Sequence, residues 1–201
     1  MSEKELVFVV DDDADVRESL GLLLGRAGYQ VKDFESGRAF LNGAVPRERA
    51  CVLADVRMPE MDGFTLQREI ARRWPDLPVI IMTGHGDIPM AVRAMRAGAI
   101  DFLEKPFEKP ALLDAIRRAL LDGAAGIGKT VPPSDPHEVL TEREFEVFRL
   151  LTEGHQNKVV AHQLGISVRT AETHRARVMS KLGARNLADL VRLSMGSDRH
   201  S

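Results

Sequence analysis

The chain contains 201 residues, of which 44% are hydrophobic and 29% are charged, a composition typical of a water-soluble protein with one or two folded domains. No apolar run approaches the ~18 residues needed to cross a bilayer. The acidic N-terminus leads directly into a short apolar segment, so we expect no secretory signal, no membrane anchor and a cytoplasmic location. The single cysteine, Cys51, excludes a disulfide framework and is expected to be a buried small hydrophobe.

The formal net charge of −2 is unevenly distributed along the chain. Residues 1–122 hold 17 Lys and Arg against 21 Asp and Glu, whereas residues 139–201 hold 10 against 7. This surplus of positive charge in the second half is compatible with a nucleic-acid partner, but it is too small to indicate one without a motif beside it.

Residues 1–122 alternate short apolar runs with helical patterns. The runs rich in β-branched residues are 6–10, 51–54, 79–82 and 100–104. This alternation is typical of a parallel sheet covered by helices. We therefore predict a flavodoxin-like α/β domain with a parallel five-stranded sheet in the order 2-1-3-4-5.

Polar residues directly follow these runs: Asp11-Asp12-Asp13, Asp55, Thr83 and Lys105. Because ligands of such sheets bind at the carboxyl ends of the strands, we expect these side chains to form one site. Carboxylates in close proximity repel each other unless a cation joins them, and a ligand set made only of oxygen suits Mg²⁺. A carboxylate nucleophile, a metal ion, a hydroxyl and a fixed cation together indicate phosphoryl transfer to aspartate.

Four stretches of this half resemble the receiver domain of two-component response regulators: Val9–Asp13, Asp55–Gly63, Met82–Gly84 and Lys105–Phe107. The resemblance covers about residues 4–122.

That resemblance implies a role for each residue of the site. Asp55 would accept the phosphoryl group, Asp12 would bind Mg²⁺ directly, Asp11 would assist through water, and the backbone carbonyl of Arg57 would add a ligand. Thr83 and Lys105 would contact the phosphoryl group, Phe102 would be the switch aromatic, and the Lys105-Pro106 bond would be cis. By analogy, Arg57 and His85 would lie beside the path of hydrolytic water, and we expect them to set the lifetime of the phosphorylated state.

Other interpretations of the acidic site remain open at this stage. Taken singly, the aspartates could be helix caps, Thr83 a turn residue and Lys105 a surface charge. Asp11-x-Asp13 also fits the spacing of haloacid-dehalogenase-type phosphatases, in which Asp11 would be phosphorylated, but this leaves Asp55 and Lys105 unexplained. A calcium loop would need glycine where Val16 stands.

Residues 123–137 are rich in Gly and Pro and predict a flexible linker. They include Gly123-x-x-x-x-Gly128-Lys129-Thr130, a formal match to a phosphate-binding loop. Such a loop should follow a strand and open a helix, whereas this one follows a helix and runs into Pro132-Pro133, so we reject the match.

Residues 138–195 predict a small all-α domain, followed by a tail at 196–201. Thr141 and Glu144 form a capping-box pattern at the start of its first long helix. A second helix is expected over Asn157–Leu164, and Gly165 supplies a tight turn. Ser167 caps a third helix that runs to about Leu182. Helix, glycine turn and helix predict a helix-turn-helix.

This second segment resembles the output domain of NarL/LuxR-type regulators, and most closely the FixJ branch. Its third helix has one polar, cationic face suited to the major groove, and neighbouring polar residues are placed to touch phosphates. The resemblance also implies a fourth helix, at about Leu187–Ser194, that pairs two DNA-bound copies. The residues assigned to DNA contacts are Asn157, Lys158, Ser167, Arg169, Thr170, Glu172, Thr173, His174, Arg177 and Lys181.

The whole chain is therefore expected to be a transcription factor rather than an enzyme. A partner histidine kinase would phosphorylate Asp55, and the modified chain would dimerise, bind double-stranded promoter DNA and act with RNA polymerase. The alternatives are a constitutive DNA-binding dimer with a scaffold receiver and a stand-alone aspartyl phosphatase. The resemblance implies a dimer interface, for which the candidate residues are Ile88, Met90, Val92, Met95, Leu187, Leu190 and Val191.

Overall fold

The computed structural model describes residues 5–84, 88–125, 136–184 and 186–197. The chain divides into two compact units, one formed by residues 1–85 and 97–129 and the other by residues 86–96 and 130–201.

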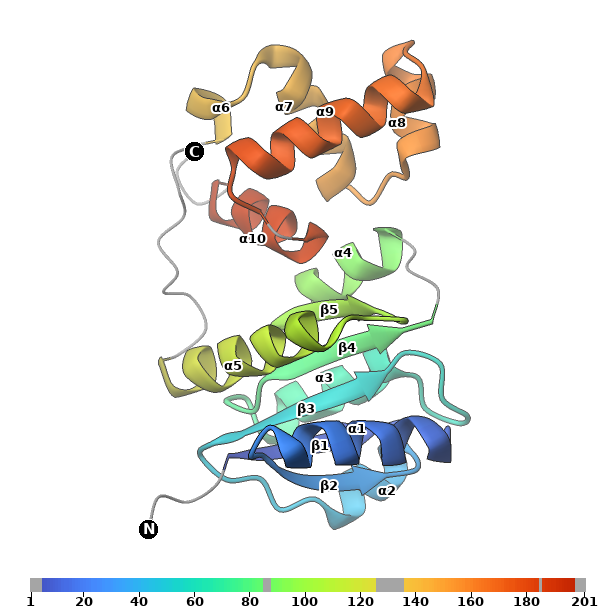
Figure 1. Ribbon diagram of the computed structural model, residues 1–201, viewed down its shortest axis with the longest axis vertical. Coiled ribbons are helices and arrows are strands. Elements are labelled where there is room, and N and C mark those ends of the chain that lie inside the picture. The colour runs from blue at the N-terminus through green and yellow to red at the C-terminus, as the bar shows by residue number, and fades with distance from the viewer. Residues whose placement is uncertain (1–4, 85–87, 126–135, 185, 198–201) are drawn as a thin grey trace. The chain divides into compact units, whose positions relative to one another are not determined.

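The first unit contains a parallel five-stranded sheet (Figure 1). Its strands are β1 (Leu6–Val10), β2 (Gln30–Phe34), β3 (Ala50–Asp55), β4 (Val79–Thr83) and β5 (Asp101–Glu104). The order is β2-β1-β3-β4-β5 and every neighbouring pair is parallel, so the predicted fold class and strand order are confirmed.

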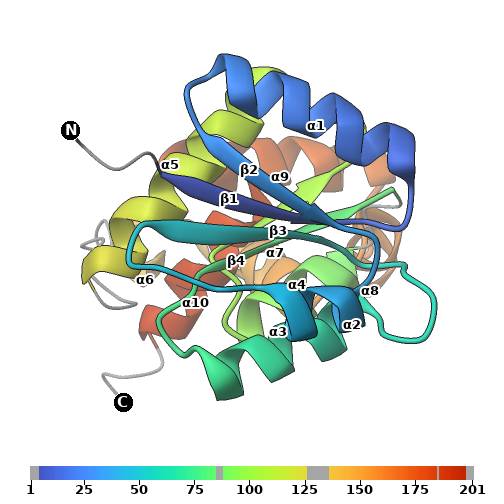
Figure 2. The same ribbon diagram turned by 90° about the horizontal axis from the view of Figure 1, so that it is seen from below.

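Helices cover both faces of this sheet. Figure 2 shows α1 (Ala14–Arg26) and α5 (Lys109–Ala125) on one face, and α2 (Gly37–Gly43) and α3 (Gly63–Arg73) on the other. Every residue of β1, β3 and β4 is buried, which explains why these strands appear in the sequence as continuous apolar runs. Cys51 lies in this core as expected, and burial raises the pKa of its thiol.

The second unit is helical. It contains α4 (Ile88–Arg96), α6 (Pro136–Val139), α7 (Glu142–Thr152), α8 (Asn157–Leu164), α9 (Val168–Lys181) and α10 (Leu187–Ser197). Thr141 and Glu144 form the predicted capping box at the start of α7. Gly165 has φ 63°, the left-handed conformation that glycine adopts most readily, and it makes the turn between α8 and α9. The helix-turn-helix arrangement is therefore confirmed.

The two units do not divide the chain at a single point. Helix α4 groups with the C-terminal helices because it packs against α10. The segment predicted as a linker also begins in a helix, since α5 continues to Ala125. Gly123 thus lies in a helix rather than in a loop after a strand, which agrees with rejecting the phosphate-loop match, and residues 126–135 lie outside the described residues.

No helix among the described residues is long and apolar enough to cross a membrane.

Candidate functional site

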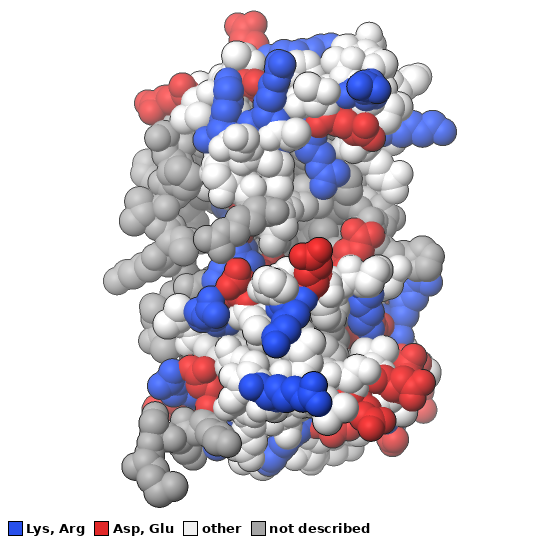
Figure 3. All heavy atoms as spheres, viewed as in Figure 1, with Lys and Arg blue, Asp and Glu red and all other residues white. Residues whose placement is uncertain are grey.

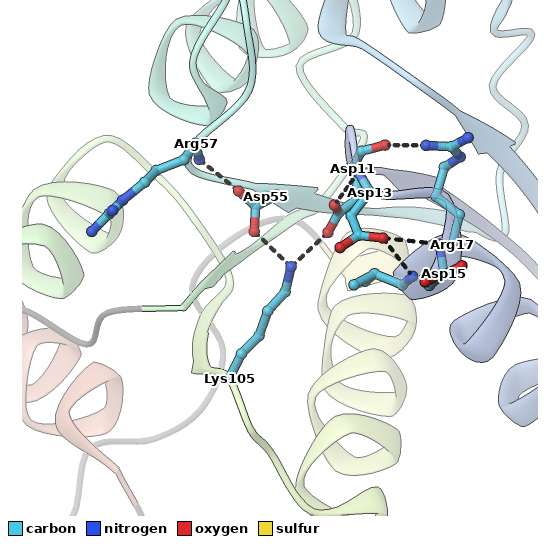
Figure 4. Close-up of polar contacts among 8 residues, drawn as sticks. Asp11, Asp13, Asp15, Arg17, Asp55, Arg57 and Lys105 are labelled. Carbon is cyan, nitrogen blue, oxygen red and sulfur yellow. Dashed lines mark hydrogen bonds and ion pairs between the residues drawn. The ribbon is translucent and has the colours of Figure 1, made fainter.

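The ends of three strands meet at one edge of the sheet (Figure 4). The Lys105 ammonium, which follows β5, donates hydrogen bonds to Asp11 Oδ2 at 2.6 Å and to Asp55 Oδ1 at 2.7 Å. Asp11 is 1% exposed and Asp55 is 7% exposed, so the single positive charge of the lysine lies between two carboxylates that are largely removed from water. The structure thus brings together Asp11 and Lys105, which lie 94 positions apart in the sequence.

The loop after β3 holds the other side of Asp55. Its Oδ2 accepts a hydrogen bond from the backbone N–H of Arg57 at 2.6 Å. Burial raises the pKa of Asp55, while the hydrogen bonds from Lys105 and Arg57 oppose that rise in part. Burial alone would lower the pKa of Lys105, but its hydrogen bonds with Asp11 and Asp55 outweigh that effect and raise it. Burial and mutual contact thus act in opposite directions on the pKa of each of these two groups.

Glycine is required where α3 begins, directly against Asp55. A Cβ atom on Gly63 would lie 2.3 Å from the carbonyl oxygen of Asp55. The Gly63 N–H also donates to the Val56 carbonyl at 3.0 Å, and the Asp62 side chain caps the helix by accepting from the Thr65 N–H at 2.7 Å. The backbone of the site and the first turn of α3 therefore lie in direct contact.

The loop after β1 gives the three aspartates different environments. Asp13 Oδ1 accepts from the N–H groups of Asp15 at 2.9 Å and Val16 at 3.4 Å, so Asp13 is the N-cap of α1. Asp11 Oδ1 accepts from the Asp13 N–H at 3.0 Å, and the Asp12 side chain is exposed. Asp13 therefore acts as a helix cap, one of the interpretations that the sequence left open.

Sequence reasoning missed Arg17. Its Nη1 donates to the Asp11 carbonyl at 2.8 Å and its Nε donates to Asp33 Oδ2 at 3.2 Å, so it ties the ends of β1 and β2 together. A single arginine in a helix gives no sequence signal for such a contact.

The other two predicted switch residues, Thr83 and Phe102, lie in β4 and β5. Thr83 is the last residue of β4 and is fully buried, and its carbonyl accepts from the Lys105 N–H at 2.7 Å. Phe102 lies in β5 and is half-buried. The cis bond between Lys105 and Pro106 is confirmed. His85 lies outside the described residues.

The donors at this edge are compatible with Mg²⁺. Among the described residues, no three acidic, histidine or cysteine side chains converge as a preformed metal cage. Mg²⁺ does not need one, because it keeps several waters and binds through one or two carboxylates. The oxygen atoms of Asp11, Asp12 and Asp55 and the backbone carbonyl of Arg57 are donors of the required hard type.

The second unit presents α9 as an amphipathic helix. Ser167 caps it by accepting from the Thr170 N–H at 3.1 Å, and Ala171 and Val178 are buried in the core. Figure 3 shows Lys and Arg side chains projecting from the visible face of the C-terminal helices. The predicted DNA-contact residues of the turn and of α9 that are exposed are Ser167, Arg169, Thr170, Glu172, Thr173, Arg177 and Lys181, whereas His174 is half-buried.

Lys181 differs from the other predicted DNA contacts. Its ammonium donates to Glu144 Oε2 at 2.7 Å, and the Glu144 side chain is 5% exposed. Lys181, together with hydrogen bonds from Thr141, lowers the pKa of Glu144 to about 2. The Lys181 ammonium is thus engaged by a buried carboxylate of its own unit, and its role as a DNA contact stays a prediction.

The residues predicted at the dimer interface differ in burial. Leu190 is completely buried in the core of its own unit, where Leu187 packs beside it, and Val191 is completely buried as well. On α4, Val92 and Met95 are buried, Met90 is half-buried, and the side chain of Ile88 is not described. Leu190, Val191, Val92 and Met95 are therefore buried within the single chain, and their role at a dimer interface stays a prediction.

Two family models match this chain. Residues 7–117 match the response regulator receiver domain, and residues 138–194 match the bacterial regulatory proteins of the luxR family. The chain belongs to the response regulators. This response regulator is 43% identical over 204 residues to the transcriptional regulatory protein FixJ of Azorhizobium caulinodans, with 97% of the chain and 94% of the relative covered.

Another relative and two solved structures are similar to this chain over nearly its full length. The response regulator is 42% identical to FixJ of Bradyrhizobium diazoefficiens, with 97% of each chain covered. A crystal structure of full-length FixJ from B. japonicum is 39% identical with a TM-score of 0.56 and covers 100% of both chains. The structure of the response regulator StyR is 43% identical with a TM-score of 0.57, covering 96% of this chain and 100% of StyR. The chain is therefore a FixJ-like transcriptional regulator with a receiver and a LuxR-family DNA-binding domain.

Proposed function

We propose that phosphorylation of Asp55 by a partner histidine kinase makes this response regulator bind promoter DNA as a dimer. The observation that carries the proposal is the contact of one ammonium, that of Lys105, with both Asp11 and Asp55 at the ends of three strands. A nucleophilic carboxylate held beside a fixed cation is the arrangement that phosphoryl transfer to aspartate requires.

The chemistry follows from the environment of Asp55. One carboxylate oxygen of Asp55 attacks the phosphorus atom of a phosphohistidine, the new O–P bond forms as the P–N bond breaks, and the imidazole nitrogen keeps the electron pair and takes a proton. Lys105 lies within reach of oxygens on the transferred group because it already contacts Asp55 Oδ1. Mg²⁺ held by Asp11, Asp12, Asp55 and the Arg57 carbonyl would supply further positive charge for those oxygens.

The modified site then acts on the switch residues. The Thr83 hydroxyl closes on the phosphoryl group, and Phe102 on the neighbouring strand moves inward. Arg57 and His85 set how long the phosphoryl group persists. A local change in charge is thereby coupled to a change in the surface that the regulator presents.

Helices α8 and α9 contact the DNA. The N-terminal and exposed residues of α9 enter the major groove, while residues at the start of α8 contact phosphates. A dimer would match a two-fold symmetric site and double the phosphate contacts, so affinity falls steeply as salt rises. RNA polymerase in the cytoplasm is the partner on which the bound regulator acts. The proposed contacts are Asn157, Lys158, Ser167, Arg169, Thr170, Glu172, Thr173, His174 and Arg177.

Intact-mass measurement tests the phosphorylation step. The native chain, Asp55→Asn and Asp11→Asn are each incubated with Mg²⁺ and acetyl phosphate, and the added mass is followed with time. We expect one phosphoryl group on the native chain, none on Asp55→Asn and slow addition on Asp11→Asn, because Asp11 assists the metal but is not the nucleophile. Phosphorylation of Asp55→Asn that is lost in Asp11→Asn would favour the phosphatase alternative.

A further inference from the structure

Two adjacent residues in the first turn of α7 each reach a different helix of the helix-turn-helix. Arg143 donates through Nη2 to the carbonyl of Leu164, the last residue of α8. Glu144 accepts, through Oε2, the ammonium of Lys181, the last residue of α9, at 2.7 Å. One turn of α7 is thus bonded to the C-terminal ends of both α8 and α9.

The contact from Arg143 lies beside the turn. Leu164 immediately precedes Gly165, whose left-handed backbone connects the two helices. Carbonyls in the last turn of a helix lack partners within the helix, and a cation at this end also interacts favourably with the helix dipole. The guanidinium is oriented by a second bond, from Nη1 to Glu146 Oε2 at 2.7 Å. Arg143 therefore holds the point at which α8 ends.

The contact from Glu144 is preorganised. Its carboxylate accepts from the Thr141 N–H at 3.0 Å and from the Thr141 hydroxyl at 2.9 Å. These bonds hold the carboxylate in the orientation in which it contacts Lys181, and the lowered pKa of Glu144 keeps the carboxylate ionised. Charge-assisted hydrogen bonds are short and directional, so they constrain the orientation of the helices that they join. The apolar contacts of Val160 and Ala171 in the same core bury surface but are not directional.

We propose that Arg143 and Glu144 are positioning residues for DNA recognition, and that Lys181 acts through Glu144 rather than by touching a phosphate. The proposal rests on the DNA-binding function of this unit. Direct readout of base edges depends on side chains held within fractions of an ångström, so the placement of α9 relative to α8 decides which bases its polar face can reach. Loosening either contact should therefore reduce discrimination between sequences more than it reduces binding to DNA in general.

The test compares two duplexes and uses the full-length chain treated with Mg²⁺ and acetyl phosphate. The first duplex is selected by the native chain from a random-sequence library, and the second has the same composition in scrambled order. Each dissociation constant is calculated from the concentration of folded, active protein rather than from the total protein concentration. Glu144→Gln, Lys181→Met and the double variant are measured at several salt concentrations.

We expect Glu144→Gln and Lys181→Met each to weaken binding to the selected duplex by about tenfold, with little change on the scrambled duplex. The double variant should bind the selected duplex no more weakly than either single variant, because the two single substitutions remove the same contact. The salt dependence of binding should not change. Arg143→Met removes a contact that does not involve Lys181, and it should also reduce discrimination between the two duplexes. Lys181→Arg keeps the positive charge and should therefore retain the discrimination that Lys181→Met loses.

Lys158→Met serves as the matched control for a phosphate contact. It should weaken both duplexes alike and reduce the slope of log affinity against log salt by about 0.9. If Lys181→Met behaves like Lys158→Met while Glu144→Gln has no effect, Lys181 is a phosphate contact and the inference is overturned. If the native chain selects no sequence at all, the proposed DNA-binding function fails and the inference fails with it.

Discussion

Replacing Gly63 with alanine should displace the phosphorylation site. The added Cβ would lie 2.3 Å from the Asp55 carbonyl oxygen, 3.0 Å from its carbonyl carbon and 3.1 Å from the Val56 Cα. All three atoms belong to the backbone, so no side chain can rotate away. Because favourable contacts between such atoms are near 3.5 Å, the start of α3 and the Asp55 peptide must separate by about 1 Å.

The expected consequences follow from that displacement. Overpacking of this kind costs about 1–3 kcal/mol in the free energy of unfolding. A misplacement of about 1 Å in a reacting group can slow its reaction by about 100-fold. The assays are thermal unfolding and the rate of phosphorylation by acetyl phosphate in Mg²⁺, followed by intact mass.

Gly21→Ala is the matched control. Gly21 lies within α1, and a Cβ there meets no atom within 4 Å. Alanine should therefore stabilise the helix by about 0.5–1 kcal/mol and leave the phosphorylation rate unchanged. If Gly63→Ala is phosphorylated at the native rate and unfolds at the native temperature, the steric reasoning about this site is refuted.

Three further predictions concern single side chains. Lys105→Met leaves the buried carboxylates of Asp11 and Asp55 without their ammonium and should cost about 3 kcal/mol of stability, less in Mg²⁺; equal thermal unfolding of variant and native chain without Mg²⁺ would contradict this. Glu144 has its pKa lowered from 4.5 to about 2 in the folded state, so it stabilises the fold above pH 4.5 and loses that contribution as the pH falls toward 2. Native stability should therefore fall more steeply than that of Glu144→Gln in this window, and parallel unfolding profiles would count against the ion pair. Glu60 has φ 62°, which disfavours residues with a Cβ, so Glu60→Gly should gain about 0.5–1 kcal/mol in chemical denaturation, and a loss of stability would show that the strain is compensated.

The sequence predicted the elements whose pattern is set by burial. β1, β3 and β4 are buried along their whole length, so their apolar runs are unambiguous, and parallel pairing then places Asp11 and Asp55 at one edge. β2 was not identified from its residues, because it is an edge strand with a partly exposed, polar sequence, Gln-Val-Lys-Asp-Phe. An exposed edge strand gives no continuous apolar signal.

Contacts between distant polar residues were the least predictable features. Glu144 and Lys181 are 37 positions apart, and no local pattern reports that the end of α9 meets the start of α7. The same limit applies to Arg17, which contacts the Asp11 carbonyl through a side chain that looks like an ordinary helix surface residue. The dimer face was expected from the family resemblance alone, since periodicity identifies a buried face but not which elements cover it.

Phosphorylation of Asp55 should control DNA binding by this response regulator. The most direct test is the dissociation constant of the native chain for a duplex selected from a random library, measured with and without Mg²⁺ and acetyl phosphate, beside Asp55→Asn. The account predicts tighter binding of the phosphorylated native chain, with a steep dependence on salt, and no response in Asp55→Asn. Equal affinity in all states would contradict it and would leave the receiver as the scaffold of a constitutive DNA-binding protein.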